Sequence, residues 1–365
     1  MLPIKRTTRL MTFTAITAAL AGAAWADGTT AGQTINNTAT IGYSVGGVAQ
    51  PDVNSNQASF VVDMLVNLSV AELGGSATVV VPGATGQVTT FTVTNTSNAV
   101  LDFRLAATQA SNGATTKFGG TDAGDATNVV AYVDDGDDVF NAVDDTATSI
   151  NELAADASVT VFVVADIPFG VGNGGEIGLT LTAYAAAGGD GNALGSDLTA
   201  TPGADTPGAM DIVFGDAAGA SDASRDGSYS DSDEYSVSSA TMNITKQARV
   251  ISDPVNGTTN PRSVPGAVIE YCIVMENSGS ASATTLEISD NVPTYTTFVS
   301  GSIRSNGSVT SGACNADGAV DDDDASDGGE VDTATGSFVA GLVSVALASV
   351  AAGEARTALF RATID

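Results

Sequence analysis

The acidic segment 134–145 carries the residues whose types and spacing could do chemistry in this chain. Its sequence is Asp-Asp-Gly-Asp-Asp-Val-Phe-Asn-Ala-Val-Asp-Asp. Calcium takes six to eight hard oxygen ligands, and a loop with carboxylates and amides at short intervals supplies such ligands. The candidate ligands of a Ca²⁺ ion are Asp134, Asp135, Asp137, Asn141 and Asp144.

This segment also departs from the common calcium-binding loop. That loop runs Asp-x-Asx-x-Asp-Gly and ends in a bidentate acid. Here Asp138 stands where the turn glycine is expected, and the spacing is shorter. Acidic runs are usually just solvated, so an ion-free acidic turn is the alternative. The same reasoning favours solvated loops for the acidic residues of 216–234 and for the run at 321–327. We expect no cofactor other than calcium.

Catalytic residue types are scarce. The chain has no histidine, which excludes Ser-His, Cys-His and His-metal arrangements. Paired carboxylates could serve a glycosidase, but most acidic residues lie in Gly, Ala and Asp-rich stretches rather than beside aromatic residues. The glycine-rich stretches match neither a phosphate-binding loop nor a dinucleotide-binding motif. We therefore expect that the protein is not an enzyme.

The first residues predict export. Lys5, Arg6 and Arg9 precede an apolar run over 10–20, and Ala24-Trp25-Ala26 offers a cleavage site, as in a signal peptide spanning 1–26. The apolar run is too short to span a bilayer comfortably. After cleavage we expect no membrane span and an extracellular or cell-surface location, with the periplasm as a further option.

Two cysteines, Cys272 and Cys314, accompany this export signal. Disulfides form in oxidising compartments, so a bridge between these two residues is the expected state. Two free thiols or an intermolecular bridge are the alternatives.

The net charge of the chain limits the classes of partner that it can bind. Removal of 1–26 leaves 9 basic and 42 acidic residues, a net charge of −33. Such a surface repels the phosphates of nucleic acids and anionic lipids, so neither is expected as a partner. A salt-adapted surface would also be acidic. The hydrophobic content of 43% is enough to fill cores.

Apolar residues alternate with polar ones along most of the chain, and Val, Ile and Thr are frequent in these runs. Such a pattern predicts half-buried strands and an all-β fold. Gly46-Gly47 lies between two of the runs and predicts a hairpin turn, since glycine adopts positive φ at little cost.

The chain repeats itself. Val81-Pro-Gly-Ala84 recurs as Val264-Pro-Gly-Ala267, and Asn95 has a counterpart in Asn277. Residues 153–167 align without a gap against 350–364. The repeat predicts two homologous sandwich domains over 63–239 and 240–365, preceded by a β-hairpin segment over 27–62. That hairpin either packs on its own domain or adds as a donor strand to the sheet edge of a neighbour.

Several segments resemble a known family. Residues 252–261, Val264–Ala267, Tyr271–Ile273 and 292–302, followed by Cys314, are similar to bacterial surface proteins that carry the conserved-repeat domain of unknown function 11. Residues 34–43 resemble the openings of such proteins. The resemblance implies immunoglobulin-like β-sandwich domains on exported or cell-surface proteins with structural roles. It brings no catalytic residues.

These observations predict a secreted or cell-surface structural or adhesive module protein without catalytic activity. Its expected partners are other copies of itself or other surface proteins. The alternative is a calcium-dependent module that recognises a glycan or a protein. Aromatic residues are only 5% of the chain, which favours the structural role because recognition surfaces need exposed aromatics.

Overall fold

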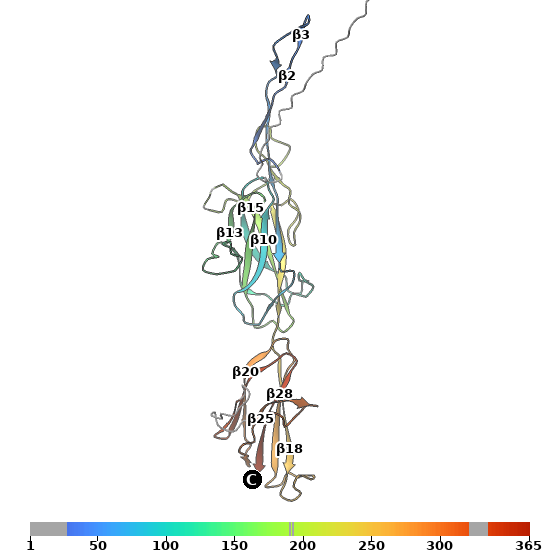
Figure 1. The fold of residues 1–365 in the computed structure, drawn as a ribbon, viewed down its shortest axis with the longest axis vertical. Coiled ribbons are helices and arrows are strands. Elements are labelled where there is room, and N and C mark those ends of the chain that lie inside the picture. The colour runs from blue at the N-terminus through green and yellow to red at the C-terminus, as the bar shows by residue number, and fades with distance from the viewer. Residues whose placement is uncertain (1–27, 190, 192, 321–334) are drawn as a thin grey trace, which may run out of the picture.

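The computed structural model describes residues 28–189, 191, 193–320 and 335–365. Every regular element in these ranges is a β-strand, so the all-β prediction is confirmed for them. The molecule is elongated, with a narrow arm at one end followed by two bodies along the long axis (Figure 1). The predicted signal peptide at 1–26 and the acidic run at 321–327 lie outside the described residues.

The N-terminal arm, residues 34–61, is a long antiparallel hairpin. Its strands pair in three steps, β1 with β6, β2 with β5 and β3 with β4. Gly46 and Gly47, with φ of 58° and 83°, form the turn at its tip, as the two-residue turn requires. Nearly all of its side chains are exposed. The strands are β1 (Thr34–Asn37), β2 (Thr40–Ile41), β3 (Ser44–Val45), β4 (Val48–Ala49), β5 (Val53–Asn54) and β6 (Ala58–Val61).

The first body, residues 64–237, is sandwich-like. One sheet has the order β12-β14-β10-β8 and the other β13-β11-β15-β17-β9, while β7 and β16 form a short parallel pair. The strands are β7 (Met64–Val66), β8 (Leu68–Leu73), β9 (Thr78–Val80), β10 (Gln87–Asn95), β11 (Leu101–Gln109), β12 (Thr127–Val133), β13 (Ser149–Leu153), β14 (Ser158–Asp166), β15 (Glu176–Ala187), β16 (Ile212–Phe214) and β17 (Ser228–Val237).

One apolar core lies between these two sheets. Alternate residues of β10, such as Phe91 and Val93, are fully buried, because successive side chains of a strand point to opposite faces. Leu179 and Leu181 of β15 meet them from the other sheet. Buried Tyr235 satisfies its hydroxyl by donating to the carbonyl oxygen of Gln87, 2.8 Å away.

The second body, residues 242–364, has its own core. A sheet in the order β18-β19-β28-β22-β25, with β21 beside β28, packs on the sheet β20-β27-β26. Cys272 and Cys314 form the expected disulfide. The strands are β18 (Met242–Ser252), β19 (Val268–Asn277), β20 (Ala283–Asn291), β21 (Thr296–Phe298), β22 (Arg304–Gly307), β23 (Val309–Thr310), β24 (Ala313–Cys314), β25 (Ala319–Val320), β26 (Thr335–Val339), β27 (Leu342–Val350) and β28 (Ala355–Ile364).

The sequence repeat is a structural repeat as well. The amide of Gly83 donates to the carbonyl of Ile167 at 3.0 Å, and that of Gly266 to the carbonyl of Ile364 at 2.8 Å. Both glycines have positive φ, 79° and 84°, a conformation that glycine adopts without strain. The strand order β8-β10-β14-β12 in the first body also matches β18-β19-β28-β22 in the second.

The junction between the bodies is short and hydrogen-bonded. Oδ1 of Asn173, in a loop of the first body, accepts hydrogen bonds from the amide of Ser239 at 2.8 Å and from the hydroxyl of Ser280. The amide of Ser280 donates to the carbonyl of Ser239 at 3.0 Å. A Cβ on Gly279 would lie 2.1 Å from that same carbonyl oxygen, so the two segments pack in direct contact. The linker is therefore held by both bodies.

Candidate functional site

The predicted calcium-binding segment is the loop between β12 and β13. Carboxylate oxygens of Asp134, Asp135 and Asp137 all lie within 4.8 Å of one another. Asp134 is nearly buried, whereas the other two are exposed. Three carboxylates at this separation could hold a metal ion. The structure thus brings together three of the five predicted ligands.

The other two predicted ligands are engaged in local turns. Oδ1 of Asn141 accepts a hydrogen bond from the amide of Val143 at 3.1 Å, and its Nδ2 donates to Asp144 at 2.8 Å. Asp144 is not a member of the three-carboxylate group. A residue that sequence reasoning left out shapes the loop instead. Buried Asp145 accepts hydrogen bonds from the amides of Asp135 at 2.9 Å and Asn141 at 2.7 Å.

Electrostatics within this loop disfavour its fully ionised form. Desolvation, followed by the charges of Asp137 and Asp145, raises the pKa of Asp135 above its ordinary value. Repulsion of this kind falls when a cation neutralises the carboxylates. The amide of Asp138 partly offsets it by donating to Asp134 at 3.1 Å.

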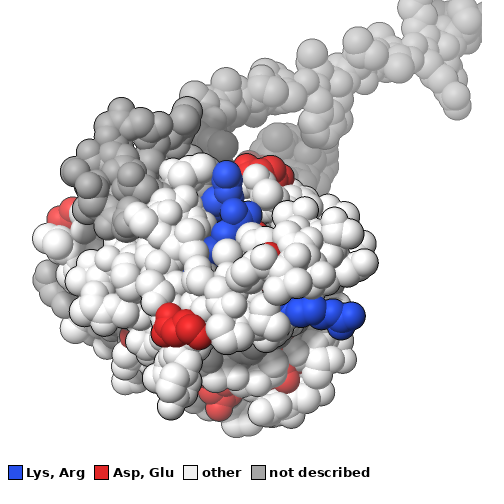
Figure 2. Space-filling model, turned by 90° about the horizontal axis from the view of Figure 1, so that it is seen from below, with Lys and Arg blue, Asp and Glu red and all other residues white. Residues whose placement is uncertain are grey.

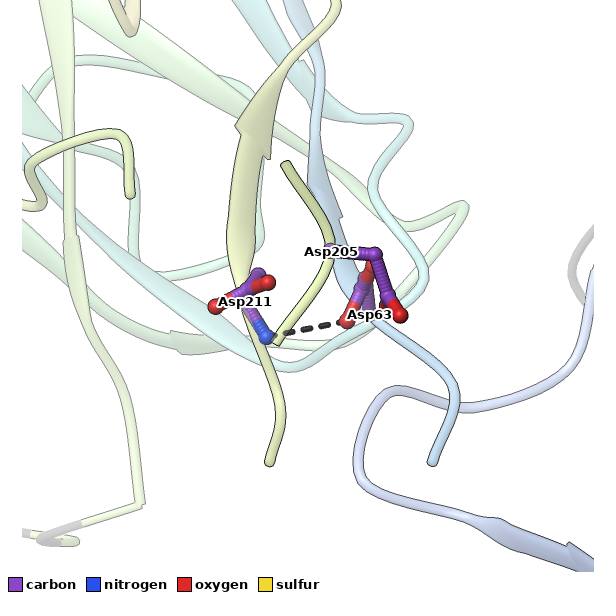
Figure 3. A group of neighbouring side chains, drawn as sticks. All are labelled: Asp63, Asp205 and Asp211. Atoms are coloured by element: carbon purple, nitrogen blue, oxygen red, sulfur yellow. Dashed lines mark hydrogen bonds between the residues drawn. The ribbon is translucent and has the colours of Figure 1, made fainter. Parts of the chain in front are cut away.

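A second acidic group, absent from the sequence-based prediction, joins distant segments. Asp63, Asp205 and Asp211 also place carboxylate oxygens within 4.8 Å of one another (Figure 3). The amide of Asp211 donates to Oδ1 of Asp63 at 2.9 Å, and the parallel pairing of β7 with β16 sets this approach. Because 148 residues separate the two aspartates, no spacing in the sequence could reveal the group.

Most acidic residues of 216–234, expected in a solvated loop, are buried or half-buried, whereas Asp226 is exposed. Asp216 is 2% exposed and accepts hydrogen bonds from the amides of Asp226 and Gly227, both at 3.1 Å. Asp231 pairs with Lys117. The solvated-loop expectation is therefore wrong for Asp216, because short aspartate side chains satisfy turn amides that would otherwise be orphaned. It is also wrong for Asp233 and Glu234, which lie in strand β17 and are each 2% exposed.

Glu270 is a further acidic residue that sequence reasoning did not single out. It is 1% exposed in β19 and lies directly opposite Arg249 of β18 and Arg361 of β28. Its carboxylate accepts from the two guanidinium groups at 2.6 Å and 2.9 Å. A buried carboxylate with two arginine partners is satisfied, so this cluster cross-links three strands of the sheet.

Comparisons with known proteins give no family. No family model matches the chain, and no curated protein matches it. The crystal structure of the class 5 fimbriae chaperone CfaA is similar at 10% identity and a TM-score of 0.23, over 78% of this chain and 83% of that chain. A structure named "Putative membrane anchored protein from Corynebacterium diphtheriae" is similar at 12% identity and a TM-score of 0.20, over 91% and 89%. At such scores neither likeness carries an argument.

The fold and the sites define an all-β, β-sandwich-like protein with a disulfide and two acidic groups that could bind a metal ion. Within the described ranges, no helix is long and apolar enough for a membrane span. The family resemblance drawn from the sequence remains a prediction.

Proposed function

We propose that this protein is an exported structural spacer, in which two immunoglobulin-like sandwich domains form a stiff rod without catalytic activity. The observation that carries the proposal is the junction around Asn173. Its hydrogen bonds to Ser239 and Ser280 connect the first body to the linker and to the second body. Inter-domain motion is the usual expectation for two domains on one chain, and this bonded junction opposes it.

Calcium is a proposed part of this role. An ion at Asp134, Asp135 and Asp137 would stiffen the loop between β12 and β13 by removing repulsion among the carboxylates. The aromatic residue of the same loop favours a structural over a recognition role. Phe140 packs against Tyr132 and Phe162, with ring centroids 5.6 Å and 5.7 Å apart, so it serves packing within the domain.

Export is the part of the proposal that can be tested directly in cells. The disulfide between Cys272 and Cys314 supports it, since such bonds persist in oxidising compartments. Fractionation of cells of a Gram-negative host, with N-terminal sequencing, should find protein outside the inner membrane with Asp27 as its first residue. Protein retained in the cytoplasm with residues 1–26 intact would contradict it.

A further inference from the structure

The two bodies differ at one sheet edge. In the first, β11 is paired on both sides, with Leu101 opposite Leu153 of β13 and Ala187 of β15. In the second, β20 is the counterpart of β11, with Ala283 opposite Val350 of β27. Leu153 and Val350 are aligned positions of the repeat. No described strand pairs with the other side of β20, where β15 lies in the first body.

A second difference lies on the neighbouring sheet. Leu68 and Val70 of β8 stand opposite Asn95 and Val93 of β10. Their counterparts in β18, Met242 and Ile244, stand opposite Asn277 and Met275 of β19.

The exposure of these counterparts differs sharply. Leu68 and Val70 are 2% and 3% exposed, whereas Met242 and Ile244 are 40% and 62% exposed. In the first body β17 lies against β8, and Asp231 of β17 accepts a hydrogen bond from the amide of Glu72 in β8. The second body thus has a free strand edge beside an uncovered apolar strip.

The N-terminal arm has the pattern such an edge requires. β15 buries apolar residues at alternate positions, among them Ile177, Leu179 and Leu181. Apolar and polar residues alternate in the arm as well, but its apolar side chains do not pack in a core and are exposed to solvent. The exposed ones are Ile35, Ile41, Tyr43, Val45, Val48, Val53 and Phe60, between 36% and 65% exposed.

Most of the acidic charge of the molecule lies in the first body. Residues 63–239 hold 25 acidic and 3 basic residues, a net charge of −22. Residues 28–62 hold a single acid, Asp52, and residues 240–365 hold 15 acidic and 6 basic residues, a net charge of −9. Figure 2 shows the end opposite the arm, where uncharged residues predominate among small acidic and basic groups. Contact between two first bodies is therefore repelled more strongly than contact between the arm, which holds one acid, and a second body.

We propose that the arm of one copy adds to the free edge of β20 in a second copy and covers Met242 and Ile244 there. The arm and the second body lie at opposite ends of the long axis (Figure 1), so the contact joins two molecules. Such strand addition uses backbone hydrogen bonds for affinity and alternate side chains for specificity. Because the two surfaces differ, the contact is head-to-tail and propagates into a linear chain. The inference deepens the proposed structural role and rests on it.

The basic residues Lys246 and Arg249 of β18 are both paired with acids of the second body. Edge strands are often protected by a projecting lysine, but Lys246 pairs with Asp290 and lies 4.8 Å from the ring centroid of Tyr271. Arg249 is held by Glu270. Both cations thus have partners in their own domain, while their side chains remain 40% and 63% exposed.

Sedimentation velocity of the mature protein over a range of concentrations tests the assembly. We expect linear oligomers that grow with concentration and persist at high salt. Ile41→Asp in the arm and Ile244→Asp in β18 should each abolish them. Val143→Asp, at a residue 80% exposed in the first body, is the matched control and should leave them intact. A monomer at every concentration would overturn the assembly.

Cysteine cross-linking tests the orientation, because both native cysteines are in the disulfide. Ile41→Cys protein mixed with Ile244→Cys protein should form mixed dimers under mild oxidation, whereas neither variant should cross-link with itself. Val143→Cys mixed with Ile244→Cys is the control and should stay monomeric. Cross-linking of Ile41→Cys with itself alone would overturn the head-to-tail contact. A flexible junction in the monomer would contradict the spacer role instead, so failure of the two proposals can be told apart.

Discussion

The side-chain amide of Asn277 donates to the carbonyl oxygen of Val350, 3.0 Å away, and Asn95 makes the same bond to Leu153 at 2.8 Å. Each asparagine is fully buried. Each also donates to the carbonyl four residues later, in Ala281 or Ala99. The same buried group thus ties two loops together in both bodies, which explains why both repeats keep it.

Replacing Asn277 by alanine should destabilise the second body. The change leaves two carbonyl oxygens without their donor, and orphaned buried polar groups cost about 1–3 kcal/mol each. Urea denaturation should show the transition of the second body shifted to lower denaturant while that of the first body is unchanged. Asn95→Ala is the matched variant and should shift the first body instead. A wild-type midpoint for both bodies in Asn277→Ala would refute this prediction.

Reduction of the disulfide should also act on the second body alone. The bond between Cys272 and Cys314 closes a separation of 42 residues, which on the chain-entropy estimate stabilises by at most about 4 kcal/mol. Calorimetry of the Cys272→Ala, Cys314→Ala double variant should show one transition lowered. The control is wild-type protein in reductant, which should match the variant. An equal fall in the temperatures of both transitions would contradict the prediction that the two cores unfold independently.

Titration of Asp233 should make the free energy of unfolding depend on pH. Burial raises the pKa of this carboxyl to about 7 from 3.8. The folded state therefore holds the proton between these pH values while the unfolded state releases it, so the contribution of Asp233 to stability falls as pH rises from about 4 to 7. Asp233→Asn should melt at a higher temperature than the wild type at pH 8 and close to it at pH 4. The exposed Asp52→Asn serves as control. A variant equally shifted at both pH values would exclude titration of Asp233 as the cause.

Calcium should stabilise the first body through the loop between β12 and β13. With a Kd of about 10⁻⁴ M, 10 mM calcium would add roughly 2.7 kcal/mol to the free energy of unfolding. Magnesium should do much less, because it demands a tighter octahedron. Asp134→Asn with Asp137→Asn should remove the calcium-specific shift, whereas Asp144→Asn should keep most of it. Equal thermal shifts with the two cations would leave the loop as an ion-free acidic turn.

Local patterns made much of this structure predictable. The alternation of apolar and polar residues predicted strands such as β10 and β14, and Gly46-Gly47 predicted the hairpin turn. The two Pro-Gly segments indicated the repeat. These signals depend on backbone preferences of neighbouring residues.

Features that depend on tertiary pairing were not predictable. Met242 and Ile244 alternate as Leu68 and Val70 do, and nothing in their sequence reveals that no described strand covers them. Likewise, Asp63 meets Asp211 only because β7 pairs with β16.

A distance measurement across the junction tests the central claim, that the two bodies form a stiff rod. Thr127→Cys in β12 and Ser349→Cys in β27 place spin labels on exposed strand residues of the two bodies. Pulsed electron paramagnetic resonance on dilute protein should give one narrow distance distribution, unchanged between low and high salt, and Asn173→Ala should broaden it. A broad distribution in the otherwise wild-type protein would mean that the bodies move independently and would contradict the spacer role.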